Sequence, residues 1–111
     1  MVFGFWKSRH QEIHAVELAE RLGKNEVLVI DVREPGEFAM GHIPGAVNIP
    51  LSSFTPARLP DPKGRQLVLT CLGGKRSGMA LDKCRAAEAA VDTHLKGGMA
   101  AWQASRLPVE R

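Results

Sequence analysis

The sequence predicts an α/β fold, with a central, mostly parallel sheet of about four or five strands and helices on both faces. Residues 27–32 and 66–70 are short, continuous runs of aliphatic and β-branched side chains, which are typical of strands buried on both faces. Elsewhere, segments with helical spacing alternate with strand-like segments. Because parallel strands are joined by crossover connections, this alternation favours a parallel sheet.

The first half of the chain is expected to form a helix, a strand, a short helix and a second strand. Apolar residues recur at helical spacing over 15–22, and Gly23 stands where a helix commonly ends. After the strand at 27–32, Pro35 suits the first turn of a short helix. A turn rich in glycine and proline then precedes a brief strand at 46–49.

The second half contains the other strong strand signal. Residues 51–58 are expected to form a short helix, and a proline-containing loop separates it from the strand at 66–70. Residues 77–90 have apolar side chains along one side and predict a longer helix. A short strand at 93–95 and a short helix at 99–104 complete the predicted order.

The length of 111 residues fits one domain, because a single core typically organises about 100 to 150 residues. Residues 1–12 have no clear periodicity and are assigned to an N-terminal arm, and residues 13–111 to the domain. The arm contains several apolar side chains, and a lid that folds back on the domain is the favoured interpretation. A docking segment for a partner or a membrane surface is the alternative.

Charge and cysteine content exclude several classes of protein. Lys and Arg outnumber Asp and Glu by 15 to 12, an excess that is small and spread out, so we expect no nucleic-acid partner. A modest positive field suits small anions instead. Two cysteines are too few for a disulfide framework, and no segment has the length of a signal peptide or membrane span. We therefore expect a cytoplasmic protein without an integral membrane segment.

The segment after the second strong strand carries the candidate chemistry. In parallel α/β sheets, ligands bind beyond the carboxyl ends of the strands, and Cys71 directly follows the strand at 66–70. The loop from Cys71 to Ser77 leads into a helix, so its N–H groups can turn inward around the sulfur. These donors, the helix N-terminus and the cations Lys75 and Arg76 all favour thiolate over thiol. The sequence therefore predicts a nucleophilic Cys71 with a lowered pKa.

Three separated motifs resemble the rhodanese family of sulfurtransferases. They are CLGGKRS at 71–77, VIDVREPGEFAMGHIPGAVNIP at 29–50 and LKGGMAAW at 95–102, and the match extends from about residue 13 to residue 109. The resemblance implies a rhodanese-like fold and a sulfane-sulfur transfer through a persulfide on Cys71. It also implies that the substrate-binding loop consists of Leu72, Gly73, Gly74, Lys75, Arg76 and Ser77.

The same resemblance indicates reactants but no cofactor beyond the covalent cysteine persulfide. Expected donors are small sulfur anions such as thiosulfate, glutathione persulfide or a protein persulfide. Candidate acceptors are a sulfur-carrier protein, thioredoxin or glutathione, with cyanide as an artificial acceptor. Asp31 and Arg33 match the family's acidic and basic pair, which could order the loop or contact a substrate. The favoured interpretation is an ion pair or network among Asp31, Arg33, Glu34 and Glu37 that only ties the strand end to the following helix.

The sequence leaves two rival functions open. One is a non-catalytic binding or regulatory module of the same fold, against which the intact cysteine loop argues. The other is a phosphatase or arsenate reductase, whose loop has five residues between cysteine and arginine. Here four residues, 72–75, separate Cys71 from Arg76, and the narrower ring suits one sulfur atom.

The remaining polar and sulfur-containing residues have plainer interpretations. Cys84 lies on the apolar side of the predicted helix and is expected to pack in the core, although a resolving thiol is the alternative. His10 and His14 have helical spacing but no third ligand nearby, so no metal site is expected. His42 is expected to make a structural hydrogen bond, and His94 has no partner that the sequence reveals.

Overall fold

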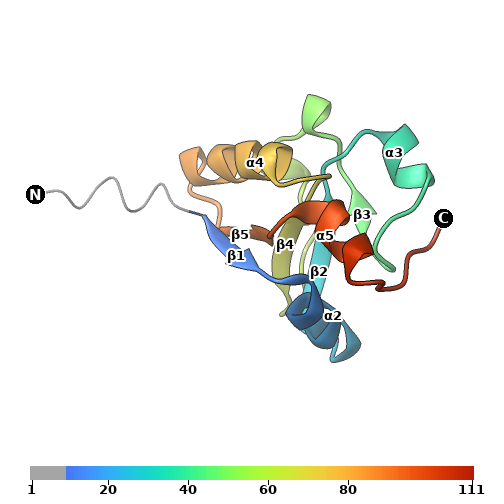
Figure 1. The fold of residues 1–111 in the computed structure, drawn as a ribbon. Helices are drawn as coiled ribbons and strands as arrows, with labels where there is room; N and C mark the ends of the chain where they lie inside the picture. Colours follow the sequence, from blue (N-terminus) through green and yellow to red (C-terminus); the bar gives the residue numbers. More distant parts are fainter. Residues whose placement is uncertain (1–9) are drawn as a thin grey trace, which may run out of the picture.

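The computed structural model describes residues 10–111, and most of the arm predicted at 1–12 lies outside them. Five parallel strands form one sheet in the order β1-β5-β4-β2-β3 (Figure 1). The strands are β1 Gln11–Ile13, β2 Val27–Asp31, β3 Val47–Asn48, β4 Gln66–Thr70 and β5 Thr93–Leu95. The predicted α/β class, with its mainly parallel sheet, is confirmed.

Helices and turns connect the strands. The helices are α2 Ala15–Gly23, α3 Pro35–Ala39, α4 Lys75–Ala86 and α5 Gly98–Ala104, and the 3₁₀ turns are η1 Leu51–Ser53 and η2 Pro56–Arg58. Figure 1 shows α4 on one side of the sheet and α2 with α5 on the other. Within residues 10–111, no helix combines the length and the apolar character that crossing a bilayer requires.

The two central strands explain why the strongest sequence signals are continuous apolar runs. All five residues of β2 are buried, and β2 pairs with β4 along their full lengths. Alternate side chains of β2 enter two separate cores: Leu28 and Ile30 face α4, whereas Val27 and Val29 face α2 and α5. Both faces of a strand must therefore be apolar when helices cover both sides of the sheet.

The structure differs from the predictions at several short elements. Strand β1 begins at Gln11, so the boundary expected at residue 13 falls inside a strand that pairs with β5. The short helix expected at 51–58 is wrong, because the extended backbone of Phe54 and Thr55 separates two 3₁₀ turns. Helix α4 occupies Lys75–Ala86 instead of 77–90, and Glu88, just beyond it, has a positive φ of 56° that ends the helical path.

An ion pair fixes the end of β2. Asp31 and Arg33 are 0% and 5% exposed, and the Arg33 side chain donates to both carboxylate oxygens of Asp31 at 2.8–3.1 Å. Arg33 Nη2 also donates to the carbonyl of Gly41 at 2.8 Å. The expected ion pair between Asp31 and Arg33 is present, but it ties the strand end to the turn that precedes β3 and not to the following helix. Glu37 binds Arg76 instead of these two residues.

Removing one member of this pair should cost much more stability than removing a surface charge. We expect Arg33→Met to lower the free energy of unfolding by about 3 kcal/mol, because Asp31 is left buried and unpaired. Arg21, whose contact with Glu26 is partly exposed at 3.5 Å, is the matched control, and Arg21→Met should cost less than about 1 kcal/mol. Urea unfolding of both variants measures the difference, and equal losses would contradict the assigned role.

Candidate active site

Cys71 lies between β4 and α4, at the carboxyl end of the sheet. The chain turns sharply there, and Gly74, the residue before α4, has a φ of 114° that favours glycine. Lys75 is the first residue of α4, so the helix N-terminus begins directly after the loop. The loop therefore brings the cysteine sulfur to the positive end of a helix, as the sequence predicted.

The first turn of α5 holds the carbonyl groups of the loop. Met99 N–H donates to the carbonyl of Cys71 at 2.8 Å, and Ala100 N–H donates to that of Leu72 at 3.0 Å. This close approach needs Gly98, since a Cβ atom there would clash with the carbonyl oxygen of Cys71 and lie 2.6 Å from the carbonyl carbon of Leu72. With its first carbonyls directed to α5, the loop can turn N–H groups toward the sulfur.

The sulfur of Cys71 lies among hydrogen-bond donors. Gly74 N–H donates to Cys71 Sγ at 3.0 Å, and the Cys71 thiol lies 3.5 Å from Ser77 Oγ. Burial alone raises the pKa of Cys71, but hydrogen bonds from the Ser77 hydroxyl and from the N–H groups of Ser77, Gly74 and Gly73 together outweigh it. The pKa of the thiol is therefore lower than its usual value, and the thiolate is favoured.

Burial restricts what can reach this sulfur. Cys71 is 1% exposed, whereas Leu72 beside it is 50% exposed. The sulfur is thus enclosed by the loop, while the loop itself faces solvent. Such an arrangement admits a small reactant more readily than a bulky one.

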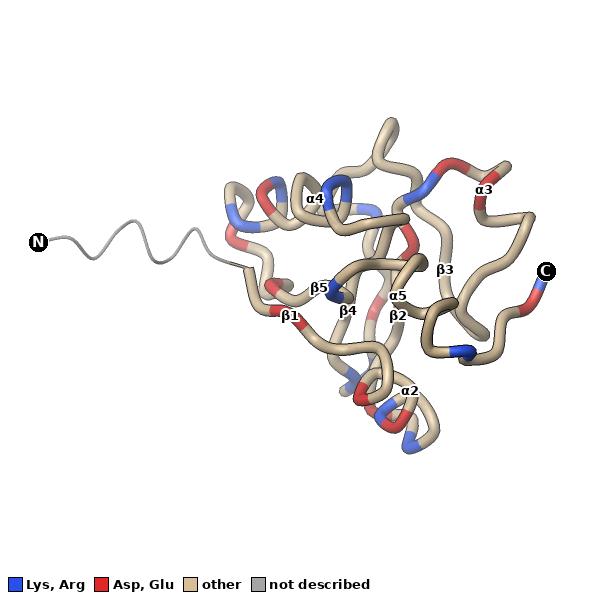
Figure 2. Tube along the Cα trace, in the orientation of Figure 1, with Lys and Arg blue, Asp and Glu red and all other residues tan. Residues whose placement is uncertain are grey.

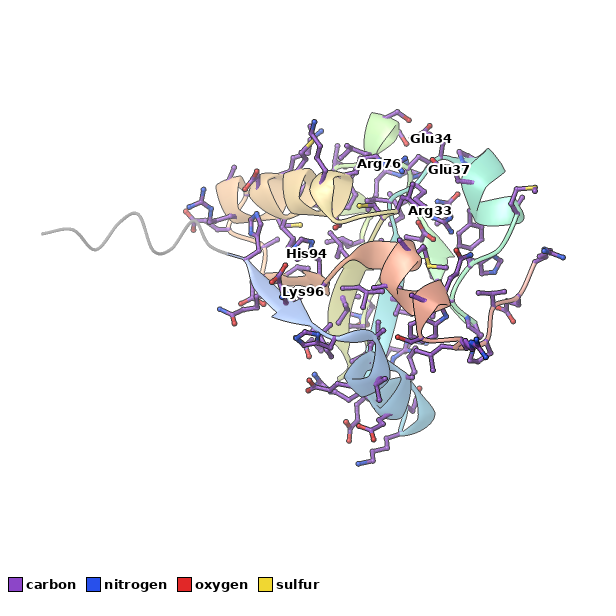
Figure 3. All side chains as sticks on the ribbon, viewed as in Figure 1. Arg33, Glu34, Glu37, Arg76, His94 and Lys96 are labelled. Carbon is purple, nitrogen blue, oxygen red and sulfur yellow. The ribbon has the colours of Figure 1, made fainter. Side chains whose placement is uncertain are left out.

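The two cations of the loop have different surroundings. The Arg76 guanidinium binds the Glu37 carboxylate through two hydrogen bonds of 2.7 and 2.9 Å and so joins α4 to α3 (Figure 3). This ion pair lowers the pKa of Glu37 to about 2, chiefly through the hydrogen bond from Arg76. Lys75 is exposed. Much of the charge of Arg76 is therefore already balanced, and N–H groups and a hydroxyl surround the sulfur directly.

The other candidate residues pack in the core or make contacts away from the Cys71 sulfur. Cys84 is fully buried in the core beneath α4, and burial raises its pKa, which agrees with the expected packing role. His42 Nδ1 lies 2.8 Å from the carbonyl of Phe38, and the two rings stack at 3.7 Å, so the expected structural hydrogen bond is confirmed. His10 contacts Asp82 at 3.0 Å. Among residues 10–111, no group of three or more potential ligands could hold a metal ion.

His94 is the site residue that sequence reasoning missed. Its Nδ1 atom lies 2.7 Å from Ser77 Oγ, the same hydroxyl that contacts Cys71. Figure 3 shows His94 between β5 and α4. Ser77 and His94 are 17 residues apart and belong to different elements, so no local motif could have shown the contact.

Substitution at Gly98 tests the dependence of the loop on α5. We expect Gly98→Ala to lower the free energy of unfolding by about 2 kcal/mol and to slow alkylation of Cys71 at pH 7, because the new methyl group pushes the loop carbonyls away. Gly36→Ala is the control, since its Cβ would meet nothing within 4 Å. Thermal unfolding and iodoacetamide kinetics report the two effects. Equal behaviour of the two variants would show that the close approach is unimportant.

The Glu37 ion pair should make stability depend on acidity. The pKa of Glu37 is about 2 in the fold against an ordinary 4.5, so its stabilisation is present above about pH 4.5 and is lost as the pH falls toward 2. Because the side chain is 37% exposed, we expect Glu37→Gln to cost only about 1 kcal/mol at pH 7 and almost nothing near pH 2.

Denaturant unfolding at both pH values measures this difference. Arg76→Gln removes the other half of the ion pair and should show the same dependence on pH. A loss that stays constant from pH 7 to pH 2 in either variant would contradict the assigned role of the pair.

Comparison with known proteins identifies the family. The model of the Rhodanese-like domain matches residues 14–105. The chain is 42% identical over 85 residues to a Synechocystis protein without an assigned function, spanning 77% of this chain and 48% of that one. It is 36% identical over 100 residues to an Allochromatium vinosum protein named "Sulfurtransferase", spanning 88% and 92% of the two chains.

A solved structure agrees with the sequence relatives. The crystal structure of a thiosulfate sulfurtransferase from Pseudomonas aeruginosa superposes with a TM-score of 0.76 at 30% identity, over 92% of this chain and 19% of that one. The family match, the relatives and the shared fold support sulfur transfer as the general class of reaction. The chain belongs to the rhodanese-like family.

Proposed function

We propose that this protein transfers sulfane sulfur from a donor to a thiophilic acceptor through a persulfide on Cys71. The observation that carries the proposal is the environment of the sulfur, in which N–H groups and the Ser77 hydroxyl lower the pKa of a thiol at the end of β4. A lowered pKa increases the fraction of thiolate, which is the nucleophilic form of cysteine.

The first half-reaction loads the enzyme. With thiosulfate as donor, the Cys71 thiolate attacks the outer sulfur atom and forms a new S–S bond. The original S–S bond breaks, sulfite leaves with its electron pair, and the enzyme retains Cys71–S–S⁻. The N–H groups that stabilise the thiolate are also suited to the terminal sulfur anion of the product.

The second half-reaction returns the enzyme to its starting state. A nucleophile such as cyanide or a thiolate attacks the terminal sulfur, and the bond between the two sulfur atoms breaks with its electrons returning to Cys71. Cyanide becomes thiocyanate, and a thiolate such as glutathione becomes a persulfide. The two stages balance without a metal or an organic cofactor, so we propose that none is needed.

Several features favour small sulfur compounds as reactants. The enclosed Cys71 is 1% exposed, and the short ring from Cys71 to Arg76 suits one added sulfur atom. Exposed Lys75 provides positive charge at the loop for an approaching anion. We therefore propose thiosulfate or glutathione persulfide as donor and glutathione as acceptor. A protein persulfide as donor, or thioredoxin or a sulfur-carrier protein as acceptor, would have to bring its own sulfur atom into the loop.

Mass spectrometry of the intact chain tests the proposal. After incubation with thiosulfate or glutathione persulfide, we expect the mass to increase by one sulfur atom, and cyanide should remove that atom as thiocyanate. Cys71→Ser should gain no sulfur, whereas Cys84→Ala should still be loaded. Failure of both donors to load the folded wild-type chain would instead favour a binding module, and hydrolysis of an aryl phosphate dependent on Cys71 would favour a phosphatase.

A further inference from the structure

A chain of contacts leads from the sulfur to a buried histidine. Cys71 Sγ lies 3.5 Å from Ser77 Oγ, and Ser77 Oγ lies 2.7 Å from His94 Nδ1. Ser77 is fully buried, and His94 is 7% exposed. The path from the sulfur to the imidazole therefore runs through buried protein groups, which makes His94 a candidate to exchange the proton when the thiol ionises.

The imidazole of His94 lies beside two glycines, Gly74 in the loop and Gly78 in α4. A Cβ atom at Gly74 would lie 4.0 Å from His94 Cε1, and one at Gly78 would lie 3.9 Å from the same atom. The imidazole of His94 thus packs directly against the N-terminal turn of α4. This packing holds Nδ1 at hydrogen-bond distance from Ser77.

The surroundings of His94 are compatible with a neutral imidazole that can accept a proton and become positively charged. Burial lowers the pKa of His94, the charge of Glu12 opposes this effect, and His10 adds to it. Glu12 Oε2, from β1, lies 3.9 Å from His94 Nε2 and would face the new positive charge. The His10 ring meets the His94 ring edge-on at 5.8 Å, and His10 itself binds Asp82 of α4.

From this geometry we propose that His94 accepts the proton of the Cys71 thiol by way of the Ser77 hydroxyl. The thiol proton moves to Ser77 Oγ while the original Ser77 hydroxyl proton moves to His94 Nδ1. The products are a Cys71 thiolate, an intact Ser77 hydroxyl that now donates to it, and a His94 imidazolium. No electrons are exchanged. The proposal rests on the proposed function, in which Cys71 must ionise before it takes up sulfur.

The direction of the Ser77 hydrogen bond explains why His94 matters. The hydroxyl has one hydrogen, and in the thiol state its shorter contact is His94 at 2.7 Å, compared with 3.2 Å to the carbonyl of Gly74. Once His94 is protonated, its Nδ1–H donates to Ser77 Oγ and the hydroxyl hydrogen is free to point at Cys71. His94 is thus a positioning residue that acts on the sulfur through Ser77.

The pH profile of Cys71 alkylation tests this role. We expect His94→Phe to raise the apparent pKa of Cys71 by about one unit and to slow alkylation at pH 7 about tenfold, with the rate at high pH unchanged. His42→Phe is the matched control, because His42 binds the carbonyl of Phe38, and its profile should equal that of the wild type. Peptide mass spectrometry separates Cys71 from buried Cys84. An unchanged profile in a folded His94→Phe variant overturns the proposal.

A second measurement needs no substitution. If the two groups exchange a proton, each shifts the titration of the other. We expect alkylation of wild-type Cys71 by iodoacetamide to lower the NMR titration midpoint of His94 by about half a unit or more, because the thiolate no longer stabilises the imidazolium. A midpoint that does not move overturns the proposal.

These measurements are independent of sulfur transfer. A chain that shows the coupling between Cys71 and His94 but takes sulfur from neither thiosulfate nor glutathione persulfide would contradict the proposed function alone. A chain that is loaded with sulfur but lacks the coupling would contradict only the role of His94.

Discussion

The site depends on the contact between the first turn of α5 and the loop after β4. Met99 and Ala100 donate to the carbonyls of Cys71 and Leu72, and only glycine at position 98 permits this approach. In a trans peptide unit the C=O and N–H groups point in opposite directions. When the carbonyl of one loop residue points to α5, the N–H of the following residue therefore points away from α5. The same contact therefore satisfies buried acceptors and orients donors toward the sulfur. Fold and chemistry are linked here, because a shift of α5 would change the surroundings of Cys71.

The pKa of Cys71 results from the opposing effects of burial and hydrogen bonding. Burial favours the neutral thiol, whereas the Ser77 hydroxyl and the nearby N–H groups favour the thiolate, and the hydrogen bonds prevail. Cys84 shows the outcome without such donors, since burial raises its pKa. Both cysteines are almost fully buried, at 1% and 0% exposure. The opposite pKa shifts of the two thiols thus arise from the hydrogen-bond donors and not from exposure.

Sequence reasoning predicted what depends on continuous local patterns and missed what depends on distant contacts. The runs that form β2 and β4 were recognisable because both faces of each strand are buried, and Cys71 because it directly follows β4. Strand β1 was missed because it has three residues, only one of which is buried. The contact of His94 with Ser77 joins two elements through the fold, so periodicity and spacing carry no trace of it.

The distribution of charge also bears on which chemistry the loop suits. Figure 2 shows Lys and Arg interspersed with Asp and Glu on α2 and α4. The guanidinium of Arg76 is held by Glu37, and that of Arg33 by Asp31. In phosphoryl transfer the charged oxygens of the phosphoryl group would stay bound at Cys71, where a free guanidinium binds them best, whereas the charged sulfite part of thiosulfate leaves the site. A persulfide carries one charge on one terminal sulfur, which a small ring of N–H donors and a hydroxyl can stabilise. The arrangement of this loop therefore favours sulfur over phosphate as the group transferred.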